Sequence, residues 1–211
     1  MADTKASKLV LYSDFDINQL QFSPPSVNNK QQKTAWVKYQ GKRCMIQTPE
    51  VTFPFGITSY QNKPENNKTL ALQLDNPKFL EVVRAIDAKV LAYVHEHCEA
   101  FFGKRYTPEF LEDLFRSNVK YGKDDKYPPT LRIKIQDTVK YCDSNSEEVD
   151  RCYLTKQSKG KCMMQLGAVY FMDKSFGLPL YAHNVQVLEQ PVQDFGFIAE
   201  NNVHGHEQEY E

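Results

Sequence analysis

The stretch KYPPTLRIKI (126–135) decides the fold, because it contains the clearest β-strand signal in the chain. In TLRIKI (130–135) apolar and polar residues alternate, a period of two that is typical of a strand with one buried and one solvent-facing side. Two prolines with fixed φ stiffen the start of this strand. The solvent-facing side therefore carries two cations, Arg132 and Lys134.

Further strand signals lie on both sides of this stretch. TAWVKYQGKRCMIQT (34–48) is typical of a hairpin that turns at Gln40-Gly41, and TLALQL (69–74) alternates. The other runs are TVKYC (138–142), RCYLT (151–155), CMMQLGAVYFM (162–172) and LPLYAHNVQVLE (178–189). Short strands separated by polar turns favour a barrel or a sandwich.

One long helix interrupts the strands. Asp75 or Asn76 can cap it, and Pro77 suits its first position. Apolar residues then recur every three or four positions, at Phe79, Leu80, Val83, Ile86, Val90, Leu91 and Val94. Gly103 ends this pattern, and Thr107-Pro108-Glu109 begins a short second helix. We predict a helical region over about 76–116.

These signals predict an α+β fold that is mainly β, with a long helix. Residues 34–190 form the predicted domain, with the helical region as an insertion. Residues 1–33 are polar and end in SPPSVNNKQQK, which predicts an N-terminal arm. Residues 191–211 contain five carboxylates and no Lys or Arg, which predicts a flexible acidic tail.

Composition narrows the class of protein. The chain has 211 residues, a net charge of -1, 41% hydrophobic and 25% charged residues, as in ordinary soluble globular proteins. No apolar run approaches the roughly 18 residues of a membrane span, and the start lacks the apolar core of a signal peptide. The five cysteines form no CxxC pair, which indicates reduced thiols. We expect an intracellular protein that does not bind membranes.

Sequence motifs for catalysis are missing. The chain has no GxxxxGK[ST], GxGxxG or GxSxG motif. His95 and His97 are two apart on a predicted helix, so they point in different directions, and the cysteine spacing fits no zinc pattern. We predict a non-enzymatic protein with no catalytic residue, no metal and no cofactor.

Cations and aromatic rings recur together in several stretches. Lys and Arg neutralise nucleic-acid phosphates, and rings stack on unpaired bases. Tyr and Phe are also common core residues, and Lys is usual on the outer side of strands, so each stretch alone also fits a purely structural role. Their recurrence favours nucleic-acid binding. The candidate contacts are Trp36, Lys38, Tyr39, Lys42, Arg43, Lys104, Arg105, Lys120, Tyr121, Lys126, Tyr127, Arg132, Lys134, Lys140 and Tyr141.

The order of these elements resembles one protein family. PEVTFPFGITSY (49–60), TLALQL, a long helix and KYGKDDKYPPTLRIKI (120–135) together resemble the single-stranded DNA-binding proteins (SSBs) of nucleocytoplasmic large DNA viruses, relatives of podophage replication SSBs. The resemblance covers roughly 34–189 and is most specific at PFGI (54–57) and KYPPTLRIKI. It implies an OB-fold-like barrel, a basic and aromatic DNA groove and an acidic C-terminal tail.

The resemblance assigns DNA contacts to Lys120, Tyr121, Lys126, Tyr127, Arg132 and Lys134. The resemblance does not extend to the C-terminus, where Tyr210-Glu211 stands in place of the terminal aromatic residue of the phage proteins.

The leading hypothesis is a sequence-tolerant single-stranded DNA-binding protein for DNA replication, recombination or repair. RNA as a second ligand and a homo-oligomer stay open. The acidic tail would recruit replication proteins, and the location would be the host cytoplasm, in a viral replication compartment, or the nucleus. Two alternatives remain: a scaffold protein of such a compartment with protein partners on the same surface, and an enzyme with scattered catalytic residues.

Overall fold

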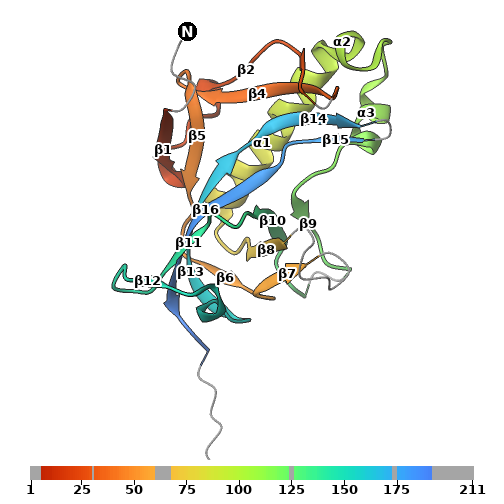
Figure 1. Ribbon diagram of the computed structural model, residues 1–211. Coiled ribbons are helices and arrows are strands. Elements are labelled where there is room, and N and C mark those ends of the chain that lie inside the picture. Colours follow the sequence, from red (N-terminus) through yellow and green to blue (C-terminus); the bar gives the residue numbers. More distant parts are fainter. Residues whose placement is uncertain (1–5, 30, 60–67, 124–125, 173–174, 192–211) are drawn as a thin grey trace, which may run out of the picture.

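The computed structural model describes residues 6–29, 31–59, 68–123, 126–172 and 175–191 (Figure 1). Nearly all of the predicted acidic tail, from residue 192 onward, lies outside these residues. Most of the regular structure in the described part is β, with three α-helices inserted after β8. Within that part, no helix combines the length and the hydrophobicity needed to cross a membrane.

The strands form one connected sheet. Its main path runs in the order β15-β14-β4-β5-β13-β16-β10-β8-β7. These strands span β4 (Lys33–Tyr39), β5 (Lys42–Gln47), β7 (Ile57–Ser59), β8 (Lys68–Gln73), β10 (Thr130–Ile135), β13 (Ser158–Leu166), β14 (Ala168–Met172), β15 (Ser175–Gly177) and β16 (Leu180–Glu189). Strands that are distant in sequence, such as β5 and β13, are therefore neighbours in space.

Shorter strands extend this path at its sides. They are β1 (Ser7–Leu11), β2 (Leu20–Phe22), β3 (Ser26–Val27), β6 (Val51–Phe53), β9 (Val119–Lys120), β11 (Lys140–Cys142) and β12 (Glu148–Val149). β11 runs parallel to β16 and antiparallel to β12. Short 3₁₀ turns occur at Tyr12–Asp14, Ile17–Gln19 and Arg151–Tyr153.

The alternation in TLRIKI gives the strand one buried and one exposed side, as predicted. Leu131 and Ile133 are fully buried, and Arg132 and Lys134 are exposed. The predicted hairpin is also present, because β4 and β5 are antiparallel and join through a two-residue turn. Gln40 and Gly41 have φ values of 51° and 77°. Two positive φ values in succession are typical of the tight turns whose twist matches that of paired strands.

Residues 6–29 differ from the expected N-terminal arm. β1 pairs with β5 in parallel, while β2 and β3 pair with β4. These strands contain two to five residues, too few for a clear period of two in the sequence. Their pairing satisfies backbone groups along the first hairpin, which would otherwise lie at a free edge.

The helices cover the buried side of the sheet. α1 (Pro77–Glu96) has Asn76 as its N-cap, since this side chain accepts a hydrogen bond from the backbone N–H of Phe79. Its buried stripe comprises Phe79, Val83, Ile86, Val90 and Val94. α2 (Cys98–Phe102) ends at Gly103, and α3 (Pro108–Leu114) begins after Thr107. Figure 1 shows α1 behind β14 and β16, with α2 and α3 near the ends of β14 and β15.

The core is a single cluster of buried side chains from the helices and from one side of the strands. Ile46, Met164 and Ala182 belong to it and are paired across β5, β13 and β16. The side chains that alternate with these core residues form the opposite side of the sheet. We call that side the outer face.

Candidate nucleic-acid interface

The outer face carries a row of paired side chains across five strands, which are polar or aromatic except for Met45. Met45 pairs with Gln165, Gln165 with Tyr181, Tyr181 with Lys134, and Lys134 with Thr69. Paired residues in adjacent strands point to the same side of a sheet. The register of the five strands thus places the Lys134 cation beside the Tyr181 ring, although the two residues are far apart in sequence.

A second row lies two residues further along β5 and β13 and three further along β16, and it continues onto β11. Gln47 pairs with Met163, Met163 with Asn184, and Asn184 with Lys140 on β11. A bulge between Met163 and Met164 shifts the register with β16, which otherwise would place His183 opposite Met163. Both rows therefore share one solvent-facing surface.

Gln165, Tyr181 and Lys134 of the first row line a hollow of about 750 Å³, which we call hollow 1. β4, β5, β10, β13, β14 and β16 all contribute to it. Its aromatic side chains come from Trp36, Tyr170 and Tyr181, and its cations from Arg43 and Lys134. Trp36 is 51% exposed, so a large part of its ring surface is available to a ligand.

Two features fix the position of the Tyr181 ring in hollow 1. A Cβ atom at position 167 would come within 2.8 Å of this ring, so Gly167 lets it lie close to the backbone. The Lys134 ammonium also lies 5.9 Å from the ring centroid. Burial raises the pKa of both Tyr170 and Tyr181, so both phenols stay protonated at neutral pH.

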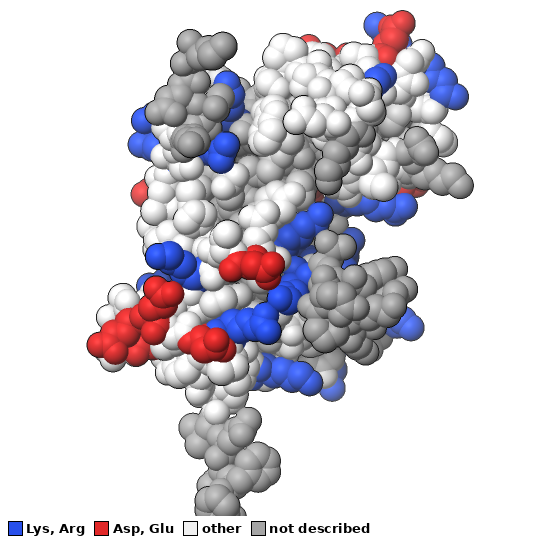
Figure 2. All heavy atoms as spheres, in the orientation of Figure 1, with Lys and Arg blue, Asp and Glu red and all other residues white. Residues whose placement is uncertain are grey.

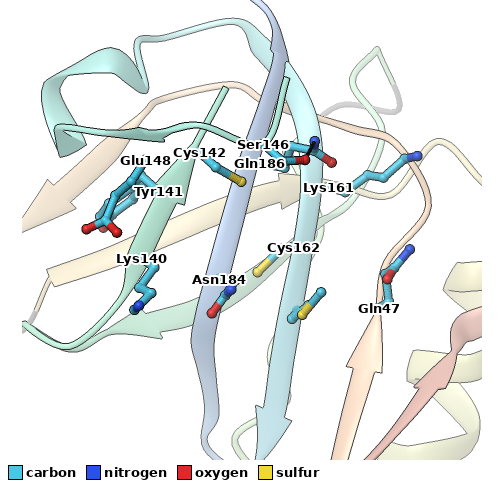
Figure 3. A pocket seen from close by; sticks show the side chains of 11 residues that line it. Gln47, Lys140, Tyr141, Cys142, Ser146, Glu148, Lys161, Cys162, Asn184 and Gln186 are labelled. Atoms are coloured by element: carbon cyan, nitrogen blue, oxygen red, sulfur yellow. Dashed lines mark hydrogen bonds between the residues drawn. The ribbon is translucent and has the colours of Figure 1, made fainter. Parts of the chain in front are cut away.

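The second row lies in hollow 2, of about 440 Å³ (Figure 3). Lys140 comes from β11, Asn184 from β16, and Lys161 from β13. Glu148 is the acidic residue of the lining, and Figure 3 shows it across β16 from Lys161. Two amino groups and one carboxylate leave hollow 2 with a net positive charge.

The two hollows are adjacent, because β13 and β16 contribute to both. Figure 2 shows Lys and Arg side chains gathered across the middle of this side of the molecule, in the region of β10, β11 and β16, with acidic side chains between them. The combined surface offers flat rings, amide groups and cations. That set can contact both the bases and the phosphates of an unpaired strand.

The structure brings part of the predicted set together. Trp36, Arg43 and Lys134 line hollow 1, and Lys140 and the largely buried Tyr141 line hollow 2. The outer face of the sheet carries Trp36, Lys38, Lys120, Arg43, Arg132, Lys134 and Lys140, as strand register and alternation indicate.

Two predicted contacts are contradicted by burial. Tyr39 is 3% exposed and Tyr141 is 7% exposed, so neither ring can stack on a base. Strand alternation is the reason, because an outward Lys38 or Lys140 turns the next residue toward the core. Tyr39 stacks on Phe15 there, and its hydroxyl accepts a hydrogen bond from the backbone N–H of Asp16.

The remaining predicted residues line neither hollow. The Tyr121 hydroxyl accepts two hydrogen bonds from Arg84, which hold it toward α1. Lys126 lies 5.4 Å from the ring centroid of Tyr127, and both are exposed beside residues outside the described set. The other three are Lys42 at the hairpin turn, Lys104 over the Tyr106 ring and Arg105 near Glu99.

Several residues of the hollows were not predicted from the sequence. Tyr170, Tyr181, Gln165 and Asn184 lie in stretches that were predicted to be strands, and Lys161 directly precedes one of them. Their alternation is visible in the sequence, but a sequence pattern pairs each ring only with the cations next to it in the chain. In the folded chain, the neighbours come from different strands.

The residues that the structure describes contain no group of three or more His, Cys, Asp or Glu side chains that could hold a metal ion. Burial raises the pKa of Cys162, next to hollow 2, to about 12. Burial also raises the pKa of Cys142. Both therefore stay in the thiol form at neutral pH.

The chain matches one family model and several solved structures. A family model described as a family of unknown function (DUF5871) matches residues 61–197. No curated protein matches the sequence. Among solved structures, gp2.5, a single-stranded DNA-binding protein encoded by bacteriophage T7, matches with a TM-score of 0.50 and 14% identity, over 75% of this chain and 97% of that one. At this identity the likeness shows a shared fold.

A second solved structure is the single-stranded DNA-binding protein from bacteriophage Enc34 in complex with ssDNA. It has a TM-score of 0.49 and 10% identity, over 83% of this chain and 99% of that one.

Proposed function

We propose that this chain, which belongs to a family of unknown function (DUF5871), binds single-stranded DNA on its outer face with little sequence preference. The observation that carries the proposal is the pairing of Lys134 with Tyr181 in an open hollow that also holds Trp36 and Arg43. The T7 single-stranded DNA-binding protein shares the fold, which supports the proposal at that level.

The two hollows would bind different parts of the DNA strand. Trp36, Tyr170 and Tyr181 offer rings on which bases can stack, at about 1–3 kcal/mol per base. Lys140 and Lys161 offer amino groups to phosphates in hollow 2. A single DNA strand that runs along β13 and β16 would pass from one hollow to the other. Stacking on any base explains why such binding tolerates any sequence.

The same proposal includes a more specific fold, protein family and cellular role. The curved sheet would be an OB-fold-like barrel over residues 34–190, with α1 to α3 as its helical insertion. The resemblance in 126–135 supports a place among the SSBs of nucleocytoplasmic large DNA viruses. The protein would then act without catalysis in replication, recombination or repair inside an infected cell, and residues 191–211 would contact replication proteins.

One observation favours a protein partner instead. Leu9 and Leu11 pair with Met45 and Gln47, so they lie on the outer face at its β1 edge. They are 45% and 39% exposed. A scaffold protein would use such apolar side chains to anchor a partner.

An equilibrium titration separates these two functions. The full chain is titrated with fluorescent oligo-dT and with a duplex of equal length, at about 50 mM and about 200 mM salt. We expect tighter binding to oligo-dT and a steep loss of affinity at the higher salt, because bound cations displace counterions. Absent or salt-independent binding of oligo-dT would leave the protein-partner function as the better account.

A further inference from the structure

A third pocket opens beside hollow 1, at the end of β14 next to α2. It has a volume of about 510 Å³, and we call it the aromatic pocket. Gln32 and Met172 line both this pocket and hollow 1, so the two spaces are adjacent. Phe102 and Tyr106, both half-buried, supply its open aromatic walls, and the buried Phe171 also lines it.

These walls are held in place by contacts among three elements. The Phe171 ring stacks on Phe101, with centroids 3.6 Å apart. Phe102 meets both Phe171 and Tyr106 edge to face, at 5.6 Å and 5.3 Å. The Lys33 ammonium donates hydrogen bonds to the carbonyls of Ala100 and Phe101, which joins β4 to the end of α2.

The rim of the aromatic pocket is polar. Gln31 and Gln32 are exposed there, and an amide side chain both donates and accepts hydrogen bonds. Lys104 places its ammonium 4.9 Å from the centroid of the Tyr106 ring. The amide oxygen of Gln32 accepts a hydrogen bond from the Asn28 side chain, which leaves the Gln32 NH₂ group to donate to a ligand. A purely apolar side chain from a protein partner would offer no acceptor to that group. A nucleobase suits the pocket better, because it has flat faces for the rings and polar edges for the amides.

We propose that the aromatic pocket holds one unpaired base of the strand bound in hollow 1. This inference rests on the proposed function and adds a base-binding site to it. A paired base cannot enter without leaving its duplex. The pocket therefore favours single strands over duplexes.

The test is a double-mutant cycle between one base and one side chain. Oligo-dT strands that each lack a single base, at successive positions, are titrated against the wild-type full chain and against Tyr106→Ala. In the wild type we expect several positions, in hollow 1 and in the aromatic pocket, where loss of the base weakens binding by about 5- to 150-fold, the range that one stacked base provides. In Tyr106→Ala one of these positions should lose its sensitivity, and the positions that stack in hollow 1 should keep theirs.

Two further variants complete the design. Phe55→Ala removes an exposed ring outside the three pockets and should keep the full sensitivity. Met172→Ala alters an exposed wall of the aromatic pocket and should reduce the sensitivity even if Tyr106→Ala fails to fold.

The outcomes are distinct. If the folded Tyr106→Ala and Met172→Ala variants keep every sensitive position of the wild type, the base-binding site is refuted and the proposed function stands. If wild type binds oligo-dT but no position is sensitive, the base-binding site and the stacking in hollow 1 are both refuted. If wild type does not bind oligo-dT, the base-binding site and the proposed function are both refuted.

Discussion

The ammonium of Lys134 on β10 lies 5.9 Å from the ring centroid of Tyr181 on β16, and the two residues are register partners in a parallel strand pair. This distance is at the outer limit of a cation–π contact, about 6 Å. Lys134 is exposed, so its charge remains available to a phosphate while the ring beside it meets a base. The pair thus combines the two interactions that bind single strands.

Tyr181→Leu should weaken oligo-dT binding by about 1–3 kcal/mol, because it removes a stacking surface and keeps an apolar side chain. Tyr181→Phe keeps the ring and should bind as the wild type does. Fluorescence anisotropy at one fixed salt concentration measures both. Equal affinities for the Leu and Phe variants would show that the ring does not stack on DNA.

Trp36 is the only tryptophan, so its fluorescence reports directly on hollow 1. Oligo-dT should quench this fluorescence as it binds, because a base would stack on the exposed ring. Trp36→Ala should lose about 1–3 kcal/mol of affinity with an unchanged salt slope, since stacking releases no counterions. A salt slope that falls in this variant would mean that Trp36 acts through a neighbouring cation instead.

Tyr39→Ala should damage the fold. Tyr39 is 3% exposed and stacks on Phe15, so truncation should lower the free energy of unfolding by about 3–5 kcal/mol. Tyr39→Phe should lose only the hydrogen bond from Asp16, about 1 kcal/mol. Urea unfolding measures both values. A stable Tyr39→Ala protein that no longer binds oligo-dT would restore this residue to the DNA interface.

Asp87 on α1 should make stability depend on pH. Burial raises its pKa from 3.8 to about 6, although the Ser117 hydroxyl and Lys120 oppose that shift. The folded chain therefore binds the proton more tightly than the unfolded chain. The resulting stabilisation is complete below about pH 4 and is lost as the pH rises through about 6.

Asp87→Asn should therefore raise the free energy of unfolding at pH 7.5 by up to about 3 kcal/mol relative to wild type, and by much less at pH 4. Asp113→Asn, at an exposed position on α3, is the matched control. Urea unfolding at both pH values gives the comparison. An equal effect of Asp87→Asn at both values would contradict the role of its ionisation.

The sequence predicts strands, helix and turn well where a local pattern is complete. The alternation of TLRIKI, the stripe of α1 and the Gln40-Gly41 turn depend on neighbouring residues, so each can be recognised without the fold. β2 and β3 are too short for such a pattern, and their pairing with β4 is determined by tertiary contacts.

The candidate interface is only partly predictable for a related reason. Trp36 and Lys134 were found because each has a polar or charged neighbour at alternate positions. Tyr170 and Tyr181 were missed because their partners lie on other strands, and strand register cannot be obtained from one sequence. Tyr39 and Tyr141 were included wrongly because a Lys-Tyr pair on a strand always points its two side chains to opposite sides.

The central claim is that the cations of the two hollows hold the phosphates of a single strand. Its most direct test compares two triple variants with equal loss of charge. Arg43, Lys134 and Lys140 are changed to Ala in one variant, and Lys8, Lys78 and Lys156, which line neither hollow, are changed in the other.

The measured quantity is the slope of log affinity for oligo-dT against log salt concentration. Each lost phosphate contact should reduce this slope by about 0.7, so the first variant should lose about 2 units and the second almost none. Equal slopes in the two variants would contradict the account. DNA affinity would then depend on the overall charge of the protein and not on the cations of the two hollows.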